Sequence, residues 1–166
     1  KLFSTEEQRR TMRRFVPTVY NNITLDDEGF IFVTTSALTQ EQIFQAIYNV
    51  NDTSANVTPV RRLNPRGDDI LMRGGHYGDW HAPVGDLDFV SLESNIVGPS
   101  AFVDIVVTPS GIYHVLDQKR GRVFTYDPDS IMLSIFGGLG NREGLFRNPV
   151  ALEISGDKLL VLDSRN

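Results

Sequence analysis

Residues whose side chains could do chemistry gather in one short stretch, between Gly74 and Ser100. Two of the three histidines and the only tryptophan of the chain fall there, together with several carboxylates. Histidine with carboxylate suits Zn²⁺ or similar ions, and carboxylates alone suit Ca²⁺. The candidate binding residues are His76, Tyr77, Asp79, Trp80, His81, Asp86 and Asp88.

Three interpretations of this stretch stay open. A metal site is one, although His76 and His81 are five positions apart, which is not the i, i+4 spacing of a zinc site on a helix. An exposed Trp80 beside carboxylates would instead suit a sugar or a peptide, because a ring stacks on the ligand and carboxylates accept hydrogen bonds. In the third interpretation the loop folds back and buries Trp80 as its own anchor. We assign no catalytic residue and no bound metal.

Composition narrows the class of protein. The chain has 166 residues, of which 40% are hydrophobic and 22% charged, and this balance indicates a globular protein. A net charge of −5 argues against a nucleic-acid partner, which needs clustered Lys and Arg. No apolar run approaches the roughly 20 residues that span a bilayer. Since there is no cysteine, disulfides and thiolate metal sites are excluded.

The elements that must position the candidate residues are mostly strands. A capping box at Ser4 predicts a helix that Pro17 ends, and a second one at Thr39 predicts a short helix inserted between strands. Alternating apolar residues predict strands at Ile23–Leu25, Phe30–Thr34, 57–63 and 70–73, which together make one four-stranded unit. Between Gly74 and Ser100 only Phe89–Leu92 has a strand pattern. From 102 onward four short strands follow (102–108, 111–117, 121–127 and 131–137), and then two more (150–155 and 158–163).

An internal repeat relates the last two groups of strands. In both, Ser-Gly leads into an apolar run that ends in Leu-Asp, and Asp117 and Asp163 lie 46 positions apart. A period of this length is typical of a four-stranded propeller blade.

The repeated residues are predicted to be turn devices. A carboxylate where a strand enters a turn can accept backbone N–H bonds, and a glycine allows positive φ. Arg122 begins a strand and could pair with a neighbouring carboxylate. The predicted structural residues are Gly29, Gly111, Asp117, Arg122, Gly156 and Asp163.

The stretch from Phe102 to Asn166 resembles NHL repeats. GIYHVLD (111–117) matches the signature "G-x-hydrophobic-x-V-x-D", and FGGLGNREGLFRNP (136–149) matches "F-G-x-x-G-x-x-x-G-x-F-x-x-P". The usual "D-x-x-N-x-R-I" turn departs from the family pattern, because it is DQKRGRV here (117–123). The chain as a whole resembles the later blades of bacterial exported NHL proteins, in which a helix intervenes between blades.

This resemblance implies an all-β fold: a fragment of an NHL-type, six-bladed β-propeller, about two and a half blades long, with two short accessory helices. It also implies an extracytoplasmic protein that is membrane-tethered at full length, with no membrane span in this segment. The expected parts are an inter-blade helix (1–17), a blade with a helical insertion at 37–56 (18–73), a long loop (74–101), a complete blade (102–138), and a connection with half of the next blade (139–166).

The function expected from this fold is a non-catalytic scaffold that binds a protein, a peptide or an envelope glycan through its variable loops. The alternative is a metal-dependent hydrolase or lyase, because gluconolactonase-like propellers hold one divalent cation such as Ca²⁺ in the channel. For that alternative the chain offers Asn22, Asp104, Asn148 and Glu153. Open sheet edges also predict self-association or contact with missing blades.

Overall fold

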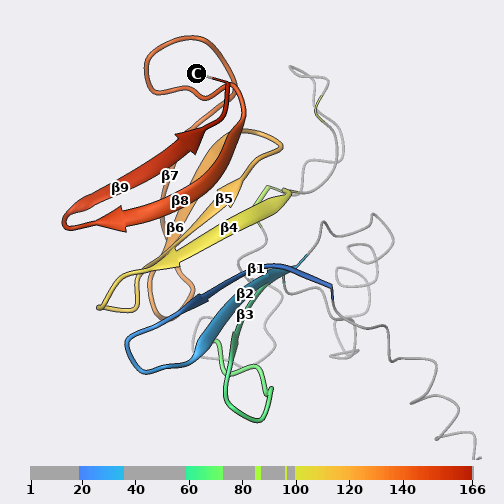
Figure 1. Cartoon of the computed structure of the whole chain (residues 1–166), viewed down its shortest axis with the longest axis vertical. Helices are drawn as coiled ribbons and strands as arrows, with labels where there is room; N and C mark the ends of the chain where they lie inside the picture. Colours follow the sequence, from blue (N-terminus) through green and yellow to red (C-terminus); the bar gives the residue numbers. More distant parts are fainter. Residues whose placement is uncertain (1–18, 36–58, 73–84, 87–95, 97–99, 166) are drawn as a thin grey trace, which may run out of the picture.

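The computed structural model describes residues 19–35, 59–72, 85–86, 96 and 100–165. These residues form an all-β structure of nine strands in three antiparallel sheets, with no helix among them (Figure 1). The all-β prediction is therefore confirmed. Both predicted helices and the predicted strand Phe89–Leu92 fall outside the described ranges.

The first sheet has three strands in the order β1-β2-β3: β1 (Tyr20–Leu25), β2 (Ile31–Thr35) and β3 (Val60–Leu63). The predicted hairpin and the predicted strand at 57–63 correspond to these three. β1 and β2 pair from Tyr20↔Thr35 to Leu25↔Ile31. β2 is buried along most of its length because it lies between two other strands.

The fourth strand predicted at 70–73 is wrong over the described residues Ile70–Met72. Only an isolated bridge, Leu63↔Asp69, continues beyond β3. The carboxylate of Asp69 accepts N–H bonds from Arg62 at 3.3 Å and from Leu71 at 3.1 Å, and so takes up donors that a strand pair would otherwise share. The side chain of Leu71, 1% exposed, is then buried in the core against the second sheet.

The second and third sheets follow the predicted strands closely. The second sheet is a meander β4-β5-β6-β7, made of β4 (Phe102–Val107), β5 (Tyr113–Asp117), β6 (Arg122–Tyr126) and β7 (Met132–Gly137). The third sheet is the hairpin of β8 (Pro149–Ser155) and β9 (Lys158–Asp163). Residue periodicity and turn-forming residues were sufficient to predict these strands, because each strand pairs with a neighbour in sequence.

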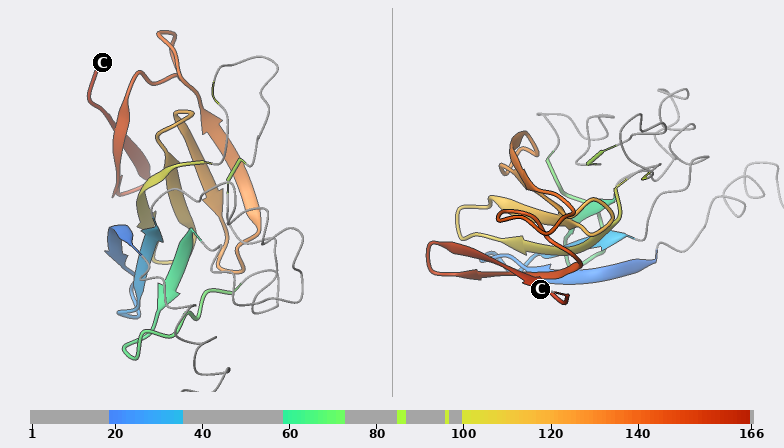
Figure 2. Two further views of the ribbon diagram at one scale, coloured as in Figure 1. Left: turned by 90° about the vertical axis from the view of Figure 1, so that its right-hand side faces the viewer. Right: turned by 90° about the horizontal axis from the view of Figure 1, so that it is seen from above.

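The three sheets are arranged in chain order, and the second lies between the first and the third (Figures 1 and 2). Their first strands are neighbours: β1 contacts β4, and β4 contacts β8. The ladders of the three hairpins also share one irregularity, because the register shifts directly after the first pair in each. The shifts lie between Tyr20 and Asn22, between Phe102 and Asp104, and between Pro149 and Ala151.

Two hydrophobic cores hold the sheets together. Between the first and second sheets, Phe32 packs on Tyr113 with ring centroids 5.5 Å apart, and Tyr113 stacks on Tyr126 at 5.3 Å. Between the second and third sheets, Leu116 and Val123 pack on Leu152 of β8. The second sheet is thus covered on both faces of its first three strands.

Four tight turns share one geometry. In each turn, the N–H of residue i donates to the carbonyl of residue i+4. The N–H of residue i+3 donates in turn to the carbonyl of residue i. The fourth residue has a left-handed φ, which glycine adopts without strain. These residues are Gly29, Gly67, Gly111 and, as the exception, Ser130 with φ 64°.

Ser130 holds its unusual conformation because its side chain has a partner. Its Oγ donates to the carbonyl of Met72, in the segment that leaves the first sheet. The residue is 6% exposed, so this hydrogen bond is shielded from water. The β6–β7 turn is therefore attached to the first sheet as well as to its own.

Candidate functional site

The predicted cluster around Trp80 lies mostly outside the described residues. Asp86 is the member that the structure places, while His76, Tyr77, Asp79, Trp80, His81 and Asp88 fall in the undescribed ranges. Asp86 and its neighbour Gly85 belong to the segment 74–101 that was predicted to be a long loop. Their contacts show how these two residues are attached to the second sheet.

Asp86 is paired with two arginines of the β5–β6 turn and of β6. Its Oδ2 lies 2.6 Å from an Nη of Arg122 and 3.7 Å from Nε of Arg120. The side chain of Arg120 is 7% exposed and that of Arg122 is 40% exposed. Asp86 therefore has its charge balanced by the protein, which favours an anchoring role for it.

Ser100 and Asp117 extend this network into the interior. The Ser100 Oγ donates to Oδ2 of Asp117 at 2.7 Å and accepts the N–H of Asp86 at 2.9 Å. The backbone N–H of Ser100 also donates to the carbonyl of Asp86 at 2.8 Å. Asp117 is 0% exposed, and an Nη of Arg120 lies 3.7 Å from its Oδ2. Two opposite charges and a hydroxyl thus join the loop to the end of β5.

Gly85 fits so closely against the second sheet that no side chain could replace its hydrogen. A Cβ built on it would lie 2.5 Å from the Oγ of Ser100 and 2.9 Å from the ring of Phe102, and its φ is 70°. The backbone of Gly85 also bonds to Tyr126. Burial raises the pKa of the Tyr126 hydroxyl, the Gly85 bond lowers it, and the charge of Asp86 raises it. The net shift is upward, so Tyr126 stays neutral and packs in the core.

Among the predicted turn residues, the two aspartates accept backbone N–H bonds and the three glycines have a left-handed φ. Asp117 Oδ1 accepts the N–H groups of Ala101 and Lys119, each at 3.0 Å. Asp163 accepts N–H bonds from Arg147 at 2.7 Å, from Asn148 at 2.8 Å and from Arg165 at 3.2 Å. Burial raises the pKa of Asp163, but these bonds and the charge of Arg147 outweigh it and hold the pKa below the usual value. Gly29, Gly111 and Gly156 have φ values of 81°, 82° and 63°.

The residues offered for a channel cation make mostly structural contacts. Asp104 is buried, and its two oxygens accept the N–H groups of Ile105 at 2.9 Å and of Leu152 at 2.6 Å. The second bond crosses from β4 to β8. Asn148 bonds to Ser164 at 2.6 Å, and Glu153 accepts the N–H of the next residue at 3.2 Å. Asn22 Oδ1 is buried without a hydrogen-bond partner.

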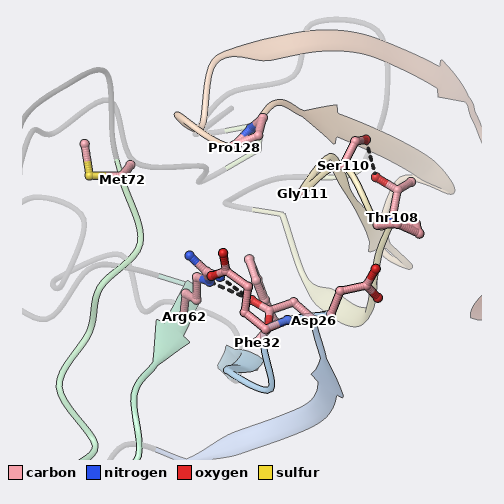
Figure 3. Close-up of a pocket in the computed structure, with 11 residues that line it drawn as sticks. Asp26, Phe32, Arg62, Met72, Thr108, Ser110, Gly111 and Pro128 are labelled. Carbon is pink, nitrogen blue, oxygen red and sulfur yellow. Dashed lines mark hydrogen bonds and ion pairs between the residues drawn. The ribbon is translucent and has the colours of Figure 1, made fainter.

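A polar pocket of about 200 Å³ opens between the first and second sheets, where the β1–β2, β4–β5 and β6–β7 turns meet (Figure 3). Arg62 lies on one side and pairs with Asp26 at 2.6 Å and with Glu28 at 2.5 Å. Its guanidinium also lies over the Phe30 ring, 4.7 Å from the centroid. The hydroxyls of Thr108 and Ser110, 2.9 Å apart, line the other side. Because the cation is already paired, the pocket offers hydroxyl and carboxylate groups rather than a free positive charge.

Sequence reasoning missed Arg120 and Ser100. Arg120 falls in a turn, where a charged residue is normally solvated, and no local pattern signals that it is buried. Ser100 gave no signal either, because its partner Asp117 is 17 positions away in sequence, and Asp104 was identified only as a candidate ligand and not as the partner of Leu152. A departure from the NHL turn pattern at DQKRGRV was the one available indication that this turn is specialised.

Three further findings bear on the class of protein. Within the ranges given above, no helix is long and apolar enough to cross a membrane. The described part of the chain also contains no group of three or more His, Asp or Glu side chains that could hold a metal ion. No family model matches the chain, and a search of curated proteins finds no match.

Proposed function

We propose that the three sheets are successive blades of an NHL-type β-propeller, and that this propeller is a non-catalytic binding scaffold at the bacterial cell envelope. The neighbouring first strands and the shared register shift support the propeller because both recur through the three sheets, and the turn aspartate recurs in the second and third. The partner is a protein, a peptide or an envelope glycan.

The observation that carries the binding role is the attachment of the long loop at Gly85 and Asp86. Ion pairs, two hydrogen bonds to Ser100 and a close backbone contact hold this point against the second sheet. A loop held in this way loses less conformational entropy when it binds, so more of its contact energy appears as affinity. We therefore propose the remaining residues of the predicted loop as the contact residues, with Trp80 and His76 as the first to test.

Binding can be tested with two probes, purified peptidoglycan sacculi and an array of peptides from envelope proteins. We expect the chain to co-sediment with sacculi or to bind a subset of peptides, and Trp80→Ala to weaken that binding about tenfold. Lys158→Ala, in the β8–β9 hairpin, is the matched control and should bind like the unmodified chain. Trp80→Phe and His76→Ala keep the test decisive if Trp80→Ala lowers the melting temperature.

Binding that is equal in the Trp80 and Lys158 variants would refute the loop as the contact surface. Calcium provides a separate discriminating test. A rise in melting temperature with added Ca²⁺, together with lactone hydrolysis that EDTA abolishes, would favour the hydrolase or lyase alternative over the scaffold.

A further inference from the structure

Large apolar side chains are exposed at both ends of the series of sheets, as well as on the edge strand β7. On β1, Ile23 is 65% and Leu25 is 64% exposed. On β9, Leu160 is 48% and Leu162 is 60% exposed. We call the Ile23–Leu25 side the outer face of the first sheet, and the Leu160–Leu162 side the outer face of the third sheet.

Strand alternation places these residues away from the two cores. Phe32 packs on the second sheet, and its pair partner on β1 is Thr24, so Ile23 and Leu25 point to the opposite side. Leu159 and Val161 pack on the second sheet, so Leu160 and Leu162 point away from it. Large apolar side chains on two such faces are unusual for a protein surface and typical of interfaces.

The shared register shows that the two faces are complementary. The third pair of each hairpin, which is the second pair after the shift, joins an Ile or Leu to a Val: Ile23↔Val33, Ile105↔Val115 and Leu152↔Val161. In the second and third sheets this pair faces the preceding sheet, where Ile105 is 1% and Leu152 is 5% exposed. Ile23 occupies the same position but is 65% exposed, whereas its pair partner Val33 is 3% exposed, so the exposed part of this face lies on β1.

The opposite partner of this contact is equally well defined. Leu152 packs on Leu116, which belongs to the second pair of its hairpin and is 0% exposed. Leu162 occupies the position of Leu116 in the third sheet, since it precedes Asp163 as Leu116 precedes Asp117. Leu162 is therefore equivalent to Leu116, and Ile23 is equivalent to Leu152. Leu162 and Ile23 do not make the corresponding contact within the described structure.

We propose that copies of this chain associate head to tail, with the outer face of the third sheet of one copy packed on the outer face of the first sheet of the next. The contact repeats the one by which the third sheet packs on the second. It joins two different surfaces and is therefore heterologous, so further copies can add until a ring closes. It requires no ligand and is independent of the binding role of the loop.

Complementary variants test the proposal with the 166-residue chain. The unmodified chain should show a mean mass, by light scattering or analytical ultracentrifugation, that rises with concentration beyond one copy. Ile23→Glu and Leu162→Glu each place a charge in the contact and should each weaken self-association roughly a hundredfold. Leu133→Glu on β7, where the side chain is 53% exposed, is the matched control and should associate normally.

Mixing the two variants distinguishes head-to-tail contact from a symmetric one. Each variant keeps one intact face, so the mixture should form a one-to-one dimer that does not grow further. A chain that stays monomeric at all concentrations, a variant that still associates alone, or a mixture that stays monomeric would each overturn the proposal. Leu25→Glu and Leu160→Glu repeat the test on the same faces if a first variant loses its circular-dichroism spectrum.

Discussion

Asp117 and Asp163 occupy the same position in neighbouring sheets, yet their surroundings differ. Both end the second strand of a hairpin, and both accept backbone N–H bonds from the segment that precedes the first strand. Asp117 is 0% exposed and also contacts Ser100 and Arg120, whereas the bonds of Asp163 are at the surface. The hydrogen bonds of the turn are local, but the burial around the aspartate determines how much they contribute to the stability of the fold.

The first prediction tests this difference directly and has the largest expected effect. Asp117→Ala removes one of the carboxylates that balance the buried Arg120 and leaves a buried hydroxyl and two N–H groups without their acceptor, so it should lower the free energy of unfolding by about 3–5 kcal/mol. Asp163→Ala exposes its N–H donors to water and should cost distinctly less. Urea unfolding of both variants measures the contrast. Equal losses would mean that burial adds nothing to the turn.

The residues one position earlier extend the contrast to the hydrophobic core. Leu116→Ala opens a cavity between the second and third sheets and should cost about 3 kcal/mol. Leu162→Ala removes a side chain that is 60% exposed, so it should change stability by less than about 0.5 kcal/mol. Thermal unfolding at a concentration where the chain is monomeric compares the two. A large loss at Leu162 would show that its face is covered within a single chain.

Glycines provide a third contrast, between the loop attachment and a free turn. Gly85→Ala meets Ser100 and also has a left-handed φ, so we expect a loss of about 2–3 kcal/mol. Gly156→Ala has nothing within 4 Å and faces only the conformational cost, about 1 kcal/mol. Chemical denaturation of the pair gives the difference. Similar losses would refute the tight seating of the loop at Gly85.

The smallest expected effect concerns pH. Burial lowers the pKa of His114 below 6.5, and its Nδ1 lies 2.9 Å from the Thr125 hydroxyl. The unfolded chain therefore binds a proton more readily, so stability is fully present above pH 6.5 and is lost as pH falls through the folded-state pKa. Leu160 occupies the position of His114 in the third sheet. His114→Leu introduces the same residue and should remove this part of the pH dependence. The reverse change, Leu160→His at an exposed position, should add none.

Much of the fold could be predicted from sequence because its contacts are local. From Phe102 onward every strand pairs with a neighbour in sequence within its own sheet, and tight turns with Gly or Asp mark the boundaries. The prediction at 70–73 was wrong because a single carboxylate, Asp69, replaces ladder bonds with its own. No periodicity signals such a competition.

The site was less predictable for a different physical reason. The carboxylate of Asp86 was identified as a candidate ligand, but its partner Arg122 lies 36 positions away, and its neutralisation became apparent only when the loop and the sheet were in place. Arg120 illustrates the same point, since charged residues in turns are usually solvated but its side chain is 7% exposed. Ser130 adopts a glycine conformation because it bonds to Met72, 58 positions earlier.

The bond from the Leu152 N–H to Asp104 has a consequence for hydrogen exchange. This amide of β8 is protected by a side chain of β4 rather than by β9, so it can exchange with solvent only when the second and third sheets separate. Its exchange rate would therefore report the opening of that interface, while amides bonded within the β8–β9 hairpin would report fraying of the hairpin itself. Asp104→Asn would weaken the protection at one amide and make sheet separation visible as a single accelerated signal.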